Sequence, residues 1–116
     1  MARLSRPLKT AFWEDDKVCR LSRDARLTLA GLITKMADDE GRFVATPGAV
    51  AGALFPHDDI STARMKRWLG EIKGEGMVSI YRVNGGTYGC LNGWAKHQRP
   101  PHPSASTLPS PEEATP

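Results

Sequence analysis

The sequence predicts a single α+β domain in which three helices and one short strand precede a C-terminal β-hairpin. Three stretches carry apolar residues at helical spacing, and one stretch of β-branched and aromatic residues is interrupted by Asn-Gly-Gly. The 116 residues are enough for one hydrophobic core and too few for two. We divide the chain into a basic arm (residues 1–11), a folded domain (12–99) and a Pro/Ser-rich tail (100–116) that we expect to be disordered.

The first helix is predicted to begin after Ser22, whose hydroxyl can accept a hydrogen bond from a free backbone N–H group. Asp24 follows in the first turn, where the helix dipole favours a negative charge. The predicted buried stripe consists of Ala25, Leu29, Leu32, Ile33 and Met36. The acidic residues 38–40 and the following glycine end this helix, and residues 42–44 leave room for only a very short strand.

A second, shorter helix is predicted where Thr46 acts as the cap and Pro47 occupies the first helical position. The third helix is predicted over residues 61–75, with Ser61 as its cap. Its buried stripe comprises Met65, Trp68, Leu69 and Ile72. Its opposite face combines Ala63, Arg67, Gly70 and Gly74, with Lys66 and Lys73 on one flank and Arg64 and Glu71 on the other.

Two glycines on this exposed helical face need an explanation, because each costs about 1 kcal/mol relative to alanine. Close approach of the face to another surface would require small residues at Gly70 and Gly74. In the alternative interpretation, Gly74 belongs with Gly76 to the end of the helix, and Gly70 has no particular role. The sequence leaves both interpretations open.

Residues 77–94 predict the hairpin, because the asparagine and glycines of the Asn-Gly-Gly stretch accept positive φ angles. The resulting order of elements, α, β, α, α, β, β, is that of a winged helix whose wing is the hairpin. That architecture places residues 61–75 in the position of the helix that reads DNA.

The net charge of +3 is distributed unevenly along the chain. Residues 64–99 contain seven basic and two acidic side chains, whereas residues 10–63 carry a balance of −3. We therefore predict a DNA-binding surface, with Arg67 nearest the base edges and the other cations near phosphates. The candidate contacts are Arg64, Lys66, Arg67 and Lys73 on the third helix, Arg82 on the wing, and Lys96, His97, Gln98 and Arg99 after it. A solvated basic face is the alternative.

The basic arm offers Arg3, Arg6 and Lys9, which either contact phosphates or belong to an unstructured end. Cys19 and Cys90 lack the spacing of a zinc site, and we expect both to be buried thiols in a reducing compartment. The sequence has no signal peptide and no stretch approaching the ~20 apolar residues of a membrane span. We expect a cytoplasmic protein that does not contact a membrane.

Catalytic and metal-binding functions have little support in the sequence. His57, His97 and His102 are not at coordinating spacing. The acidic pairs at 15–16, 38–39 and 58–59 are the candidates for a nuclease magnesium site, but their positions are more typical of turns and helix starts. No nucleophile accompanies them. We therefore expect no enzyme activity, no cofactor and no metal.

Four segments, taken together, resemble the winged-helix domain at the start of phage replication-initiation proteins, the replisome organisers of actinobacteriophages. They are FWEDDKVCRLSRDARLTLAGLITKMADDEGR, LFPHDDI, GEGMVSIYRVNG and WAKHQRP, in this order within residues 12–100. The resemblance implies binding of double-stranded DNA at or near a phage origin, in the cytoplasm of a host bacterium. Family members often recruit replisome proteins through a further C-terminal domain. Only seventeen residues follow Arg99, so we expect the DNA-binding half alone, either as a small regulator acting at an operator or as a shortened organiser.

A rival interpretation is a protein–protein adaptor that acts on a replisome protein or another host factor. In that case the small residues of the third helix would pack against the partner. A homodimer also stays open, because a single module of this size covers only ~600–1,000 Å² on DNA.

Overall fold

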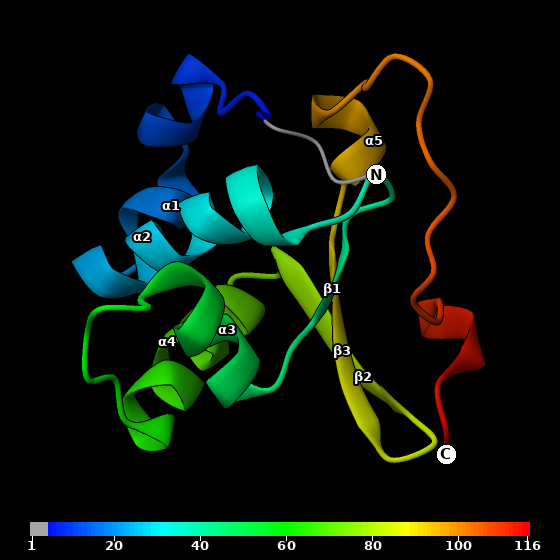
Figure 1. The fold of residues 1–116 in the computed structure, drawn as a ribbon. Coiled ribbons are helices and arrows are strands. Elements are labelled where there is room, and N and C mark those ends of the chain that lie inside the picture. Colours follow the sequence, from blue (N-terminus) through cyan, green and yellow to red (C-terminus); the bar gives the residue numbers. More distant parts are fainter. Residues whose placement is uncertain (1–4) are drawn as a thin grey trace.

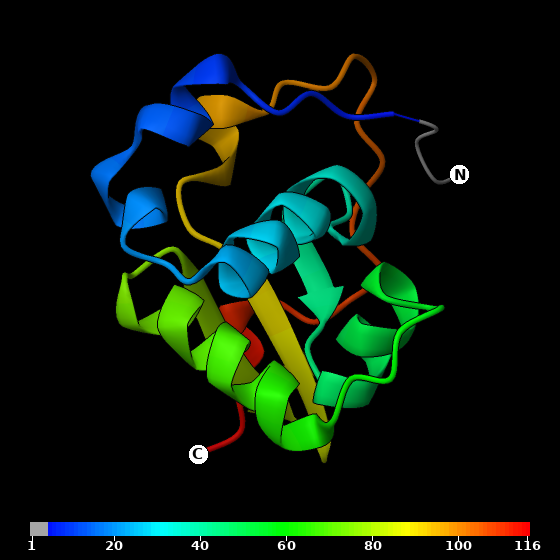
Figure 2. The same ribbon diagram turned by 90° about the vertical axis from the view of Figure 1, so that its left-hand side faces the viewer.

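The computed structural model describes residues 5–116 and shows an α+β domain. Three antiparallel strands form one sheet in the order β1-β3-β2. They are β1 (Arg42–Val44), β2 (Val78–Val83) and β3 (Gly86–Leu91). The helices lie on one side of this sheet and the C-terminal segment on the other, as Figure 1 shows. The main helices are α2 (Arg23–Gly31), α3 (Pro47–Leu54) and α4 (Thr62–Gly74), which are grouped together in Figure 2.

Between Arg23 and Leu91 the elements follow the predicted order, but the chain also contains short helical segments that were not predicted. Helix α2 continues directly into a π-helical turn, η2 (Leu32–Met36). The other additions are η1 (Thr10–Glu14), α1 (Asp16–Cys19), α5 (Trp94–His97) and η3 (Pro111–Glu113). Each is five residues or shorter, too short for a periodic apolar pattern to reveal it.

The predicted caps and buried stripes of α2 and α4 are confirmed. Ser22 accepts a hydrogen bond from the backbone N–H of Ala25, and Ser61 accepts one from Arg64. The α4 stripe is buried throughout: Met65, Trp68, Leu69 and Ile72. In the first helix Ala25, Leu29 and Leu32 are buried, while Ile33 and Met36 are half-buried against the same core. Phe43 of β1 and Val50 of α3 complete the centre of that core.

The predicted hairpin is confirmed, and its turn consists of two residues. Val83 pairs with Gly86, and the two residues that connect them form the turn. Asn84 has a φ angle of 48° and Gly85 one of 87°. Further along β3, a Cβ atom at Gly89 would overlap the ring of Phe43. The absence of a side chain at Gly89 therefore lets β1 and its Phe43 pack closely on the middle of the sheet.

The N-terminal arm is partly built into the fold, so for Arg6 neither of the two interpretations, a phosphate contact or an unstructured end, describes the structure. The Arg6 side chain is only 7% exposed and forms an ion pair with Asp39 at 3.2 Å. It also donates hydrogen bonds to the carbonyl oxygens of Ile33 and Ala37 and lies over the ring of Trp94, 5.2 Å from its centroid. Arg3 lies outside the described residues.

The expected disorder of residues 100–116 is not confirmed, since the tail lies along the outer face of the sheet. The Tyr81 hydroxyl donates to the carbonyl of Pro109 at 2.7 Å, and Arg42 donates to that of Leu108 at 3.0 Å. Near the turn, the N–H of Thr115 donates to the carbonyl of Arg82 at 2.7 Å. Side chains on the sheet face thus donate hydrogen bonds to backbone carbonyl groups of the tail. The composition of the tail does not predict these bonds.

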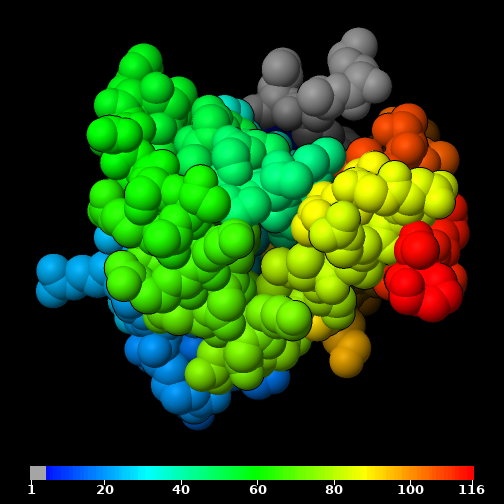
Figure 3. All heavy atoms as spheres, turned by 90° about the horizontal axis from the view of Figure 1, so that it is seen from below, coloured from blue at the N-terminus to red at the C-terminus, as the bar shows by residue number. Residues whose placement is uncertain are grey.

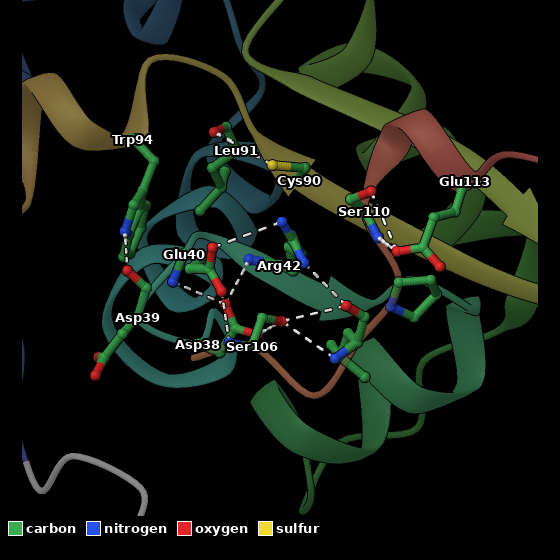
Figure 4. Close-up of polar contacts among 12 residues, drawn as sticks. Asp38, Asp39, Glu40, Arg42, Cys90, Leu91, Trp94, Ser106, Ser110 and Glu113 are labelled. Atoms are coloured by element: carbon green, nitrogen blue, oxygen red, sulfur yellow. Dashed lines mark hydrogen bonds and ion pairs between the residues drawn. The ribbon is translucent and has the colours of Figure 1, made fainter. Parts of the chain in front are cut away.

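Serines of the tail are also held by residues 38–40, between η2 and β1, which we call the acidic turn (Figure 4). Ser106 donates its hydroxyl proton to Asp38 and its backbone N–H to Glu40. The backbone N–H of Ser104 bonds to Asp39 at 2.9 Å. The tail is therefore fixed at the acidic turn and at the β2 edge.

The position of the tail decides which parts of the sheet are free. The tail covers the outer face at Tyr81 and bonds to the β2 edge at Arg82 and Asn84. An unpaired strand edge promotes pairing with other chains, and the tail protects this one near the turn. The hairpin is therefore accessible mainly from the side that faces α4.

Cys90 lies on the sheet face that the tail covers. Burial raises the pKa of its thiol above the ordinary value, and the charges of Asp38 and of Glu112 in the tail act in the same direction. The thiolate is the form that reacts with alkylating reagents, so we expect Cys90 to react slowly while the tail is in place.

Replacement of Ser106 by glutamate is expected to release the tail, because a new carboxylate would face Asp38 and Glu40. In a Cys19→Ser background, the rate of Cys90 alkylation by iodoacetamide should rise several-fold as the thiol becomes solvated. Thr107→Glu is the matched control, since Thr107 is exposed and makes no hydrogen bond within residues 5–116. Equal alkylation rates in the two variants would contradict the described position of the tail.

Candidate nucleic-acid interface

Helix α4 is fixed to the rest of the domain by its two acidic side chains. Glu71 accepts hydrogen bonds from the backbone N–H and the hydroxyl of Ser22, both at 2.8 Å. Glu75 pairs with Arg20 at 2.8 Å, and these hydrogen bonds hold the pKa of Glu75 below its ordinary value. Both carboxylates are therefore directed toward the start of α2 and the segment before it, away from the exposed face of α4.

The exposed face of α4 carries cations that have no partner. Lys66, Arg67 and Lys73 are exposed and make no hydrogen bond or ion pair with any residue from 5 to 116. Because the flank with Glu71 packs toward α2, helical periodicity puts Lys66 and Lys73 on the opposite flank. In Figure 3, seen from below, α3, α4 and the hairpin share one face of the molecule.

Arg82 lies on the side of the hairpin that faces the helices. Val78 and Ile80 pack on the core, and side chains alternate between the two faces of a strand. Arg82 follows them on the same face and is exposed near the turn. Since the tail bonds only to its backbone carbonyl, the guanidinium is not engaged by residues 5–116. We call Lys66, Arg67, Lys73 and Arg82 the α4–hairpin surface.

Arg64 behaves differently from its neighbours on α4. Its guanidinium carbon lies 5.2 Å from the centroid of the Trp68 ring, and Nη1 is 3.5 Å from the carbonyl oxygen of Asp59. The side chain thus leans back over the loop before α4, which contains Asp58 and Asp59. Arg64 is consequently a weaker candidate for a DNA contact than Lys66 or Arg67.

Residues 96–99 follow the second strand of the hairpin, as predicted, but they lie far from its turn. Lys96 and His97 belong to α5, which follows β3 at the root of the hairpin, whereas the turn lies at its other end. A strand of six residues separates the two ends by about 20 Å. Arg99 is exposed just beyond α5, so these three side chains lie apart from Arg82 and the turn.

Gln98 was the fourth predicted contact in this segment, and it is buried. The residue is 7% exposed, and its side-chain amide donates to the carbonyl oxygen of Pro7 at 2.9 Å. The amide holds the N-terminal arm against α5 and is not accessible to a phosphate or a base.

Packing does not account for the glycines on α4. A Cβ atom added at Gly70 or Gly74 would meet no atom within 4 Å. The left-handed residue after the helix is Gly76, with a φ of 75°, so Gly74 is an ordinary last helical residue. The fold therefore requires neither glycine, and the interpretation that Gly70 allows close approach of another surface stays open.

Two of the three acidic pairs have structural roles. Asp15 caps α1 by accepting from the N–H groups of Lys17 and Val18, and Asp38 accepts from those of Glu40 and Arg42. Within residues 5–116, no group of three His, Cys, Asp or Glu side chains is placed to hold a metal ion. Both cysteines are free, but Cys19 is exposed, contrary to the prediction of a buried thiol, and Cys90 is half-buried.

Comparisons with known proteins add no identity to this geometry. No protein-family model, no curated protein and no solved structure matches the chain. None of the helices in the described part of the chain has the length and apolar character needed to cross a membrane.

The sequence analysis missed a pocket of about 400 Å³ at the root of the hairpin. Its walls come from the N-terminal arm, α1, the start of β2 and α5, with Lys9, Lys17, Lys96 and His97 among the lining residues. The lining residues run from Leu8 to Gln98, so no local motif could have indicated the pocket. The sequence offered only one indication of the pocket, namely basic residues near both ends of the predicted domain.

Replacement of Gly70 by alanine is expected to raise the free energy of unfolding by about 1 kcal/mol, because the position is helical and the added methyl meets open space. Urea unfolding followed by tryptophan fluorescence measures this change. Gly89→Ala is the contrasting control, since its methyl would overlap Phe43 and should lower the stability. A destabilised Gly70→Ala variant would contradict the described exposure of this face.

Proposed function

We propose that this chain is a non-enzymatic winged-helix protein that binds duplex DNA through the α4–hairpin surface. The observation that carries the proposal is the set of three unpaired cations, Lys66, Arg67 and Lys73, on an α4 face whose acidic residues are turned away. Arg82 faces the same side from the hairpin. A surface of this charge attracts the phosphates of DNA and is stabilised by release of their counterions.

Each residue has a specific part in this proposal. Arg67 lies at the centre of the exposed face, and its planar guanidinium can donate two hydrogen bonds to the O6 and N7 atoms of a guanine in the major groove. Lys66 and Lys73 flank it and suit phosphates on the groove edge. Gly70 has open space around it, so the helix backbone can approach the groove closely. Arg82 would reach a phosphate or the adjacent minor groove.

The biological setting we infer is a phage replication origin or operator, in line with the resemblance of the four segments to replisome organisers. Lys96, His97 and Arg99 are left out of the DNA contacts because they lie at the far end of the hairpin. Gln98 is left out because it is buried.

Reversal of Lys66 and Arg67 to glutamate is expected to weaken DNA binding by more than tenfold, since it replaces two attractive charges by two repulsive ones. Duplexes selected by the wild-type protein from a random-sequence pool provide the ligand, and gel-shift titration at two salt concentrations provides the affinity. The plot of log K against log salt should become shallower by about 0.9 for each phosphate that the variant no longer neutralises.

The matched control for this experiment is Lys9→Glu with Lys96→Glu, which makes the same change of charge away from α4. It should leave DNA affinity within a few-fold of the wild type. The proposal is wrong if both double variants lose the same affinity, or if no duplex is enriched from the pool.

The adaptor interpretation has support of its own in the pocket at the hairpin root. That pocket lies apart from the α4–hairpin surface, so the two functions do not compete for the same residues.

A further inference from the structure

The pocket at the hairpin root has an apolar floor and a cationic rim. Its floor includes Phe12, Val18, Ile33, Leu91 and Trp94. Its rim carries Lys9, Lys17, Lys96 and His97, all of them exposed. A ligand that fits both parts must combine a bulky apolar group with nearby negative charge.

The basic side chains of the rim are not held by direct bonds. None of the four rim side chains makes a hydrogen bond or ion pair with the chain from residue 5 onward, although the charge of Lys17 acts on Glu75. Asp15 is the only acidic residue of the lining, and its carboxylate caps α1 through the N–H groups of Lys17 and Val18, at 2.8 and 3.2 Å. Three lysines against one carboxylate leave the lining with a net positive charge.

The polar groups at the base of the pocket are already satisfied by the fold. The Gln98 amide bonds to Pro7, the Asn92 amide to the carbonyl of Gly76 at 2.8 Å, and the Trp94 indole N–H to the carbonyl of Asp39 at 2.9 Å. Small-molecule sites usually keep a few fixed polar groups free to orient the ligand. An apolar recess with a charged rim is instead characteristic of a protein interface that receives one buried side chain.

A large exposed side chain next to the pocket points in the same direction. Trp13 is 58% exposed, and its ring centroid is 5.0 Å from that of Phe12 in an edge-to-face arrangement. Phe12 lines the pocket, so Trp13 continues the apolar surface outward beside it. Exposed tryptophans are frequent among the residues that dominate binding energy in protein interfaces.

We propose that this pocket binds an acidic segment of a partner protein. The segment inserts a bulky apolar side chain onto Phe12 and Trp94 and sets its carboxylates against Lys9, Lys17 and Lys96. The inference goes beyond DNA binding and does not depend on it, because the residues concerned are different.

The test uses the full chain and a fluorescein-labelled octapeptide in which acidic residues flank a central pair of phenylalanines. Fluorescence anisotropy measures its affinity. A peptide with glycines in place of the phenylalanines should bind at least about tenfold more weakly, and a peptide with lysines in place of the acidic residues should not bind. Equal affinity for the phenylalanine and glycine peptides would overturn the proposal, since the pocket would then contribute nothing.

Two variants locate the binding on the protein. Lys9→Glu with Lys96→Glu removes the rim charge, and Ala11→Trp fills the pocket from a lining position that is exposed. Each should weaken the acidic peptide at least about tenfold while circular dichroism and DNA affinity stay unchanged. Lys66→Glu with Arg67→Glu should have the opposite profile, losing DNA and keeping the peptide.

Three results would reject the proposal without bearing on DNA binding. Both pocket variants could bind the peptide like the wild type, or the α4 variant could lose the peptide as well. In the third result, a small aromatic anion such as 1-naphthoate would bind the pocket more tightly than the peptide, which would indicate a small-molecule site. In each case the DNA proposal is judged separately. It still holds if the α4 variant loses DNA affinity and the two pocket variants keep it.

Discussion

The ion pair between Arg6 and Asp39 is the interaction on which the outer parts of this domain depend. A buried guanidinium is tolerated only when its charge and its N–H groups are matched, and here Asp39 and the carbonyl groups of Ile33 and Ala37 match them. Removal of Asp39 would leave a buried cation without a counter-ion, which costs several kcal/mol in typical cases. The arm could then no longer stay in place.

The acidic turn extends this dependence to both ends of the chain. The carbonyl of Asp39 holds the indole of Trp94, and therefore α5, while its carboxylate and those of its neighbours hold the tail at Ser104 and Ser106. The arm and α5 form two walls of the pocket, joined by the bond from Gln98 to Pro7. The pocket is thus a product of the acidic turn, whereas the α4–hairpin surface is built on the core.

Features that depend on residues close together in the sequence were predicted correctly, whereas features that depend on distant partners were not. The α4 stripe, the Ser22 and Ser61 caps and the turn at Asn84 and Gly85 were predictable because each is set by residues within a few positions of one another. Gln98 was assigned to the DNA surface and the role of Arg6 was left open, because their partners lie 91 and 33 residues away. A buried carbonyl or carboxylate is normally hydrogen-bonded, and its donor is often distant in the sequence. A polar side chain with no neighbouring partner in the sequence can therefore still be engaged in the fold.

The charge of residues 64–99 shows the same limit and has a functional consequence. Counted along the chain, its seven cations form one basic region. In the fold Lys66, Arg67, Lys73 and Arg82 form the α4–hairpin surface, Lys96 lies at the pocket rim, and Arg64 and Arg99 belong to neither. Arg82 near the turn is about 20 Å along the hairpin from the pocket, well beyond the ~8 Å over which salt screens exposed charges. Lys73 is closer, because its carbonyl oxygen accepts a hydrogen bond from Gly76, a residue of the pocket lining. The two proposed ligands therefore use different side chains, and Lys73 is the place where one bound ligand would affect the other.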